Sequence, residues 1–330
     1  MYKYILILLV CLLPVACTQD FEEINTNQNE PETVSAALLL PTVIFDYADL
    51  AVNQNFSFGD IVGQFAANYE FNSVDIYDWT SDDRFWGIYG ILQDVKDIER
   101  YGQETNDKNY EAIGIILRSY GISILTDVYG DVPYSEATRA DEGIFAPVYD
   151  SQESIYNTLM GELKRASDLI DEDETVDGDI LFKGSMNAWK RFANSLRLRM
   201  LLRSSEAQDN SAAMQEIVDN PARYPLLDNN EDNAVYEYSG SLPDLSPYSA
   251  GRGRDYDYFL GIPTNHVINI LSANNDPRLQ VWFDPKPTTS DFIGTGPGQD
   301  LANVGRPNDF STKGASFFNE SDKISAIFMT

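Results

Sequence analysis

The sequence predicts a mainly α fold, in which a scaffold of paired helices over residues 36–206 is followed by a loop-rich region over residues 207–330. Three observations support this prediction. Apolar residues recur with a helical period in several long segments of the first region. Small residues stand on these helices where neighbours would have to approach closely. Proline and glycine become frequent after residue 207 and interrupt the helical pattern.

The chain before the scaffold has the composition of an export signal and a tether. An apolar run of about a dozen residues, Tyr4–Val15, is shorter than the roughly 20 that span a bilayer as a helix, and Cys17 follows it directly. Residues 1–16 are therefore interpreted as a lipoprotein signal peptide, cleaved before Cys17, which would carry lipid. An ordinary secretory signal is the alternative, because Pro14 stands where a lipoprotein signal usually has leucine. Residues 17–35 are acidic and lack a hydrophobic period, so they predict a flexible tether.

The scaffold helices are predicted in order from Ala36. Lys108–Asp127 carries an apolar stripe on one face. Asp150 is expected to cap the next helix, with Glu153 returning three residues later as in a capping box. A third helix is predicted over Met186–Ser204. The inward-facing residues of these helices are Ile113, Ile116, Leu117, Tyr120 and Ile124, then Ile155, Leu159, Leu163, Ala166 and Ile170, then Trp189, Ala193, Leu196 and Met200.

Small residues favour close pairing of these helices. Ala112, Gly114 and Gly121 would let a neighbouring helix approach. The pair Trp86-x-x-Tyr89 resembles the start of a tetratricopeptide helix, although no full 34-residue period is present. Trp86, at helical spacing from Tyr89, is expected in the core.

Charge and composition exclude several classes of partner. The formal net charge is −29, so nucleic acid is excluded and anionic headgroups are disfavoured, because both require cationic patches. Cys11 lies in the predicted signal and Cys17 would carry lipid, which leaves no cysteine for a disulfide. His266 is the single histidine, and this removes most routes to a zinc site. No cofactor is expected.

Four segments carry a specific resemblance. They are Asp127–Ala137 (DVYGDVPYSEA), Ser154–Leu163 (SIYNTLMGEL), Trp189–Arg203 (WKRFANSLRLRMLLR) and Asn275–Leu279 (NDPRL). Together with the tether Asp20–Asn27 (DFEEINTN), they resemble the SusD/RagB family of nutrient-binding outer-membrane lipoproteins.

The resemblance implies a tetratricopeptide-like scaffold of helical pairs with an inserted loop-rich region that binds ligand. It implies a protein that is not an enzyme, anchored at the surface of the outer membrane by a lipid such as palmitate on Cys17. The implied function is capture of an oligosaccharide or a peptide and its delivery to a SusC-like TonB-dependent transporter. Family members continue through further C-terminal helices, so the resemblance also implies that these are missing after Thr330 and that the fragment is prone to unfold without them.

Two of the signatures also predict local structure. Gly130 is expected to end a helix in the left-handed conformation, and Pro133 prevents its continuation, so the nearby tyrosines should pack this corner rather than contact ligand. The cations of the Trp189–Arg203 signature are expected to form a salt-bridged seam against acidic neighbours, with an anion site as the alternative. These cations are Lys190, Arg191, Arg197, Arg199 and Arg203.

Aromatic rings flanked by polar groups are the pattern that suits a saccharide, because sugar C–H faces stack on rings while amides and charged groups bind the hydroxyls. Two stretches fit. The first contains Tyr69, Asn72, Tyr77, Trp79 and Asp83, in a loop that contributes stacking aromatics in the resembled family. Tyr77 and Trp79 are the leading pair, and the alternative is that both plug the core. The second contains Tyr248, Arg252, Tyr256 and Tyr258, for which a surface loop resting on the scaffold is the alternative.

Other functions remain open at this point. A surface-anchored glycoside hydrolase would require two carboxylates in one cleft, with the pKa of one raised by burial. A non-binding structural subunit of the transporter complex is a third interpretation. Asp171–Asp179 imitates the first half of a calcium-binding EF-hand loop, but Val176 and Phe182 replace the required glycine and glutamate, which favours a solvated acidic turn.

Overall fold

The computed structural model describes residues 34–68, 73–78, 83–247, 261–299, 307–314 and 326–329. Within these ranges the chain is mainly helical, which confirms the predicted fold class. The elements from Ala36 onward belong to one compact unit, Ala36–Thr330. The predicted signal peptide, Cys17 and all but the last two residues of the predicted tether lie outside the described residues.

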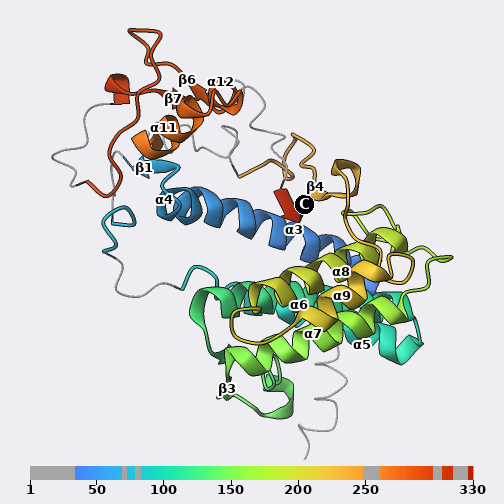
Figure 1. The fold of residues 1–330 in the computed structure, drawn as a ribbon. Helices are drawn as coiled ribbons and strands as arrows, with labels where there is room; N and C mark the ends of the chain where they lie inside the picture. Colours follow the sequence, from blue (N-terminus) through green and yellow to red (C-terminus); the bar gives the residue numbers. More distant parts are fainter. Residues whose placement is uncertain are drawn as a thin grey trace, which may run out of the picture. The chain divides into compact units, whose positions relative to one another are not determined.

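Consecutive helices form the scaffold by packing in pairs (Figure 1). They are α3 (Ala36–Gln54), α5 (Ile88–Thr105), α6 (Lys108–Tyr129), α7 (Gln152–Leu169), α8 (Met186–Arg203) and α9 (Ser211–Asp219). Helix α6 packs on both α5 and α7, α8 packs on α7, and α3 covers α5. Helix α6 and the segment Ala36–Val62 are long and apolar enough to cross a membrane, but both contribute residues to the core. The helical pairs expected from the sequence are therefore present.

Side-chain caps fix where three of these helices begin. Asp107 accepts hydrogen bonds from the backbone of Asn109 and Tyr110 at the start of α6. Ser185 caps α8 in the same way. The cap of α7 is Ser151, so the prediction of Asp150 was wrong by one residue. Asp150 instead belongs to β3 (Tyr149–Asp150), and its carboxylate accepts hydrogen bonds from the backbone of Tyr134 and Ser135. This lowers the pKa of Asp150 against the opposing effect of burial, which is the largest single influence on it.

Glycines on α6 allow the close helix contacts that the sequence predicts. A Cβ atom on Gly114 would lie 2.7 Å from the Glu99 Cβ on α5. A Cβ on Gly121 would lie only 2.2 Å from the hydroxyl of Tyr47 on α3. Gly121 is therefore the point where α3 and α6 come into van der Waals contact. The predicted inward residues of α6, α7 and α8 are buried in this core, except that Ile124 is half-buried.

The corner after α6 also matches its prediction in large part. Gly130 ends α6 with a φ of +77°, but its ψ of −119° lies outside the left-handed helical region. The chain then enters β2 (Val132–Pro133), which pairs antiparallel with β3. The Tyr134 hydroxyl accepts a hydrogen bond from Arg118 of α6 at 2.7 Å. Tyr134 is thus a packing residue, as expected.

The loop-rich half contains short elements (Figure 1). Beyond α9, the described residues of this half form the helices α11 (Asn265–Ala273) and α12 (Arg278–Trp282), which with Phe283 make a small second core. The described strands include β4 (Ala234–Tyr236) paired with β8 (Ala326–Met329), and β6 (Phe283–Asp284) paired with β7 (Thr312–Lys313). Single 3₁₀ turns lie at Asn230–Asp232 and Pro307–Asp309 in this half and at Ala140–Glu142 in the scaffold.

One further sheet joins the two halves of the sequence. Helix α3 continues through a π-helical turn, η2 (Asn55–Gly59), into α4 (Asp60–Val62) and then β1 (Ala66–Asn68). Strand β1 pairs antiparallel with β5 (Gly261–Pro263). The end of the first scaffold helix is therefore tied to the loop-rich half.

Candidate functional site

The turn Ser73–Asp78 presents the first of the predicted ligand residues. Val74 is buried and anchors the turn, whose backbone is closed by hydrogen bonds from Tyr77 N to Val74 O at 3.2 Å and from Asp78 N to Ser73 O at 2.8 Å. Tyr77 has a φ of +58°, a conformation that is uncommon for a bulky residue and is concentrated at functional sites. Its side chain is 61% exposed. The alternative that Tyr77 plugs the core is therefore wrong.

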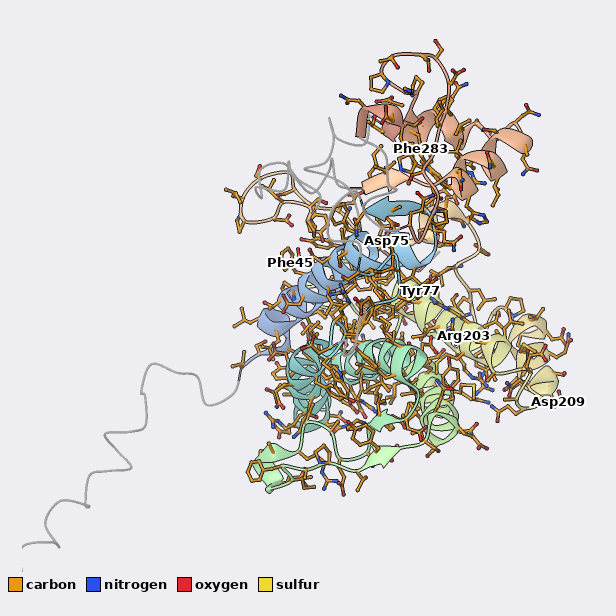
Figure 2. All side chains as sticks on the ribbon, turned by 90° about the vertical axis from the view of Figure 1, so that its left-hand side faces the viewer. Phe45, Asp75, Tyr77, Arg203, Asp209 and Phe283 are labelled. Atoms are coloured by element: carbon orange, nitrogen blue, oxygen red, sulfur yellow. The ribbon has the colours of Figure 1, made fainter. Side chains whose placement is uncertain are left out.

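Asp75 ties this turn to β1 (Figure 2). The carboxylate is buried, and its Oδ1 accepts a hydrogen bond from Asn68 N at 2.9 Å. The Oδ2 atom has no hydrogen-bond partner within the described part of the chain. Burial raises the pKa of Asp75, while the hydrogen bond from Asn68 opposes this. The Asp75 carboxylate thus holds the turn in place through Oδ1, while its Oδ2 atom can still accept a hydrogen bond.

The β1–β5 sheet is the common anchor of both predicted aromatic stretches. Asn68, the last residue of β1, is the register partner of Gly261, the first residue of β5. The first stretch follows Asn68 in the sequence and the second ends shortly before Gly261. Both are therefore attached to the same end of one small sheet. The residues Tyr69, Asn72, Trp79, Tyr248, Arg252, Tyr256 and Tyr258 themselves lie outside the described residues.

A groove of about 680 Å³ runs along α3, with polar side chains and the apolar Leu50 and Ile91 in its lining. Asp46, Asp49, Asn53 and Ser57 line it at intervals of three and four residues, which places them on one face of the helix. Gly87 and Gly90 line the other side. This face was not predicted, because aromatic rings were the expected ligand groups, yet a polar stripe on an otherwise apolar helix was the available signal.

The groove adjoins the segment that carries Asp83. Gln54 lines the groove and donates a hydrogen bond from Nε2 to the carbonyl of Arg84 at 3.3 Å. Asp83 precedes Arg84 and is exposed. Asp83 therefore lies next to a surface rich in hydroxyl, amide and carboxylate groups, all of which can hydrogen-bond to sugar hydroxyls.

One carboxylate of the groove, that of Asp46, has a raised pKa. Burial raises the pKa of Asp46, and the negative charges of Asp94 and Asp49 raise it further. Burial likewise raises the pKa of Asp94, with a contribution from Asp97. Crowded acids of this kind also occur at catalytic sites, so the groove is where a hydrolase activity would have to be sought.

Trp86 cannot offer a free face to a ligand. Its ring stacks with Tyr89 at 5.2 Å and with Tyr129 at 5.3 Å between centroids. The Tyr89 hydroxyl donates to the Pro133 carbonyl at 2.7 Å, and the Tyr129 hydroxyl accepts from Phe85 N at 3.3 Å. Trp86 is half-buried rather than in the core, which corrects one detail of the prediction.

The basic face of α8 forms the expected seam with one exception. Lys190 pairs with Glu172, Arg191 with Asp228 and Asp232, Arg197 with Glu216, and Arg203 with Asp127. Arg199 makes no ion pair with any residue of the described ranges, so the prediction was wrong for this residue. It lines a separate cavity together with Arg203.

The last residue of the acidic segment Asp171–Asp179 has a structural role. The buried Asp179 carboxylate accepts hydrogen bonds from the backbone of Leu181, Phe182 and Gly184 and from the Trp189 indole, all within 3.0 Å. Its oxygens are thus committed to organising the start of α8. Across the described ranges, no group of three or more His, Cys, Asp or Glu side chains is placed to hold a metal ion.

Comparison with known proteins places these features in a family. A model named SusD-like and described as starch-binding and associating with the outer membrane matches residues 28–330. This description is one of binding rather than catalysis. No curated protein matches the chain.

Solved structures share the fold. A chitin-binding protein is 23% identical, with a TM-score of 0.73 over 90% of this chain and 67% of its own. A SusD homologue from Bacteroides fragilis is 19% identical, with a TM-score of 0.74 over 90% of this chain and 65% of its own. A SusD/RagB family protein from Bacteroides thetaiotaomicron is 18% identical, with a TM-score of 0.72 over 90% of this chain and 65% of its own. The chain thus spans about two thirds of the length of these structures.

Proposed function

The chain belongs to the SusD-like family, and from this premise we propose that it is a nutrient-binding protein that captures an oligosaccharide at the outer membrane. The observation that carries this proposal is the convergence at the β1–β5 sheet. One exposed tyrosine, Tyr77, is presented beside this sheet, and the two aromatic stretches are attached to its end. The polar groove of α3 supplies acceptors for hydroxyl groups nearby.

The ligand face assigned to this function consists of the residues predicted from the sequence. Tyr77 and Trp79 supply stacking rings, and Asp83 supplies a hydroxyl partner. Tyr69, Asn72, Tyr248, Arg252, Tyr256 and Tyr258 complete the face from the two stretches. A starch-type glucan and a chitin-type oligosaccharide are the first ligands to test, because the family is described as starch-binding and one similar structure is a chitin-binding protein. Peptide is the second class to test.

Delivery to a transporter is the further part of the proposal. A lipid on Cys17 would hold the protein at the membrane, and a SusC-like TonB-dependent barrel would receive the captured ligand. The strongly acidic surface keeps the protein from binding anionic headgroups directly, so anchoring would depend on the lipid. Changing Cys17→Ala should release the protein from membranes, and continued membrane retention of that variant would contradict the anchor.

A surface hydrolase is the second candidate, because burial and neighbouring charges raise the pKa of Asp46 in the groove. Isothermal titration of the full chain with maltooligosaccharides, chitooligosaccharides and peptides, combined with product analysis, separates the candidates. Binding without cleavage supports the proposal. Cleavage that is lost in Asp46→Asn would establish the hydrolase. The absence of both binding and cleavage would favour a structural subunit.

A further inference from the structure

A second cavity lies on the helical scaffold, in contact with α6, α7, α8 and β8. Its volume is about 280 Å³, which corresponds to roughly nine water molecules at about 30 Å³ each. This is the scale of a single sugar or amino acid rather than an oligomer. Phe328 of β8 closes one side, packing on the Tyr120 ring with 5.4 Å between centroids. None of the residues assigned to the nutrient site lines this cavity.

The charged groups that line the cavity are two arginines and one aspartate. Asp127 is already committed, because its Oδ1 accepts a hydrogen bond from Tyr156 at 2.5 Å and its Oδ2 pairs with Arg203 Nε at 3.2 Å. Arg199 lies one helical turn before Arg203 and has no carboxylate partner in the described part of the molecule. Counting the described residues alone, the cavity therefore carries an excess positive charge on a chain whose formal net charge is −29.

The exposed cation Arg199 shares this cavity with the side chain of Tyr120. As a whole residue, Tyr120 is 6% exposed. Burial raises the pKa of Tyr120 to about 12, against the opposing charge of Arg199, so the hydroxyl keeps its proton at neutral pH. A hydroxyl that lines the cavity can donate a hydrogen bond to a ligand or to water there.

We propose that this cavity binds a small carboxylate ligand of the size of one sugar acid, with Arg199 as its ion-pair partner and the Tyr120 hydroxyl as a second donor. A guanidinium and a carboxylate form strong charge-assisted hydrogen bonds. Asp127 would disfavour a second negative charge, so a monocarboxylate fits better than a dianion. This inference does not rest on the proposed nutrient function.

The test uses ligand-observed NMR of the full chain with D-glucuronate, with D-glucose as the neutral match and inorganic phosphate as a different anion. We expect glucuronate to bind and glucose not to bind. Arg199→Ala should weaken glucuronate binding at least about tenfold, and Tyr120→Phe should weaken it several-fold, both with little change in Tm. Arg139→Ala is the matched control, because Arg139 pairs with Glu142 and does not line the cavity.

Several outcomes would overturn the proposal. They are the absence of glucuronate binding to the folded protein, equal binding of glucose, unchanged affinity in Arg199→Ala, or phosphate binding as tightly as glucuronate. Tyr77→Ala separates the two sites. It should leave glucuronate binding unchanged even if the nutrient site fails its own test.

Discussion

Substitution of glycine by alanine at two helical positions should change stability in opposite directions. Alanine has a higher helix propensity than glycine by about 1 kcal/mol in a helix interior. Gly161 of α7 has no heavy atom within 4 Å of where a Cβ would stand, so Gly161→Ala should stabilise the protein by about 1 kcal/mol. Gly121 of α6 faces the Tyr47 hydroxyl at 2.2 Å, so the same change there introduces a clash.

The cost at Gly121 follows from how tightly Tyr47 is held. Tyr47 is 1% exposed and donates a hydrogen bond to the Leu117 carbonyl at 3.1 Å. Moving the ring would break this bond, at about 1 kcal/mol, and overpacking adds about 1–3 kcal/mol. After the gain in helix propensity, Gly121→Ala should destabilise the protein by about 1–3 kcal/mol.

Urea denaturation followed by far-UV circular dichroism measures both variants against the wild type. The expected gap between the two is about 2–4 kcal/mol. Equal stability of Gly121→Ala and Gly161→Ala would refute the close approach of α3 and α6. Equal stability would also mean that the α3–α6 contact does not require a small residue at position 121.

Two further predictions concern the polar groups of the scaffold. Asp179→Ala should lower the free energy of unfolding by about 4 kcal/mol, because four donors lose their acceptor at about 1 kcal/mol each. The control Asp177→Ala changes an exposed residue and should cost little stability. Equal losses of stability for the two variants in thermal melts would contradict the role of Asp179. Hydrogen bonds from Lys164 and Tyr224 lower the pKa of Glu216 to about 2, below its usual 4.5. The wild type should therefore be more stable than Glu216→Gln by its full margin above about pH 5, and this margin should disappear as the pH falls toward 2. A margin that does not depend on pH would contradict the role of the ionised Glu216 carboxylate.

Regular features of the fold followed from the sequence because they depend on local patterns. The apolar period of Lys108–Asp127 and the glycines of α6 predicted both a helix and its contacts. The cap of α7 was misplaced by one residue, because Asp150 and Ser151 both carry a capping oxygen and only the pairing of β2 with β3 distinguishes them.

Features that depend on distant contacts were less predictable. Trp86 stacks on Tyr89, which its helical spacing allows, but its second partner, Tyr129, lies at the end of α6, and its half-buried position was not predicted. The sequence does not distinguish Arg199 from the other cations of α8. The arrangement of α6, α7 and α8 leaves it without a carboxylate partner among the described residues. The polar stripe that begins at Asp46 has a helical period in the sequence, but it contains no aromatic residue and so did not fit the pattern expected of a saccharide site.

The central claim is that ligand binds at the face presented by Tyr77. The most direct measurement is isothermal titration of wild type, Tyr77→Ala and the control Phe145→Ala with the tightest-binding maltooligosaccharide or chitooligosaccharide, together with the Tm of each. Tyr77 is 61% exposed, and Phe145, on the scaffold, is 82% exposed, so neither change should alter Tm appreciably. We predict that Tyr77→Ala weakens binding about 5- to 30-fold and that Phe145→Ala leaves it unchanged. Wild-type affinity in Tyr77→Ala would contradict the claim.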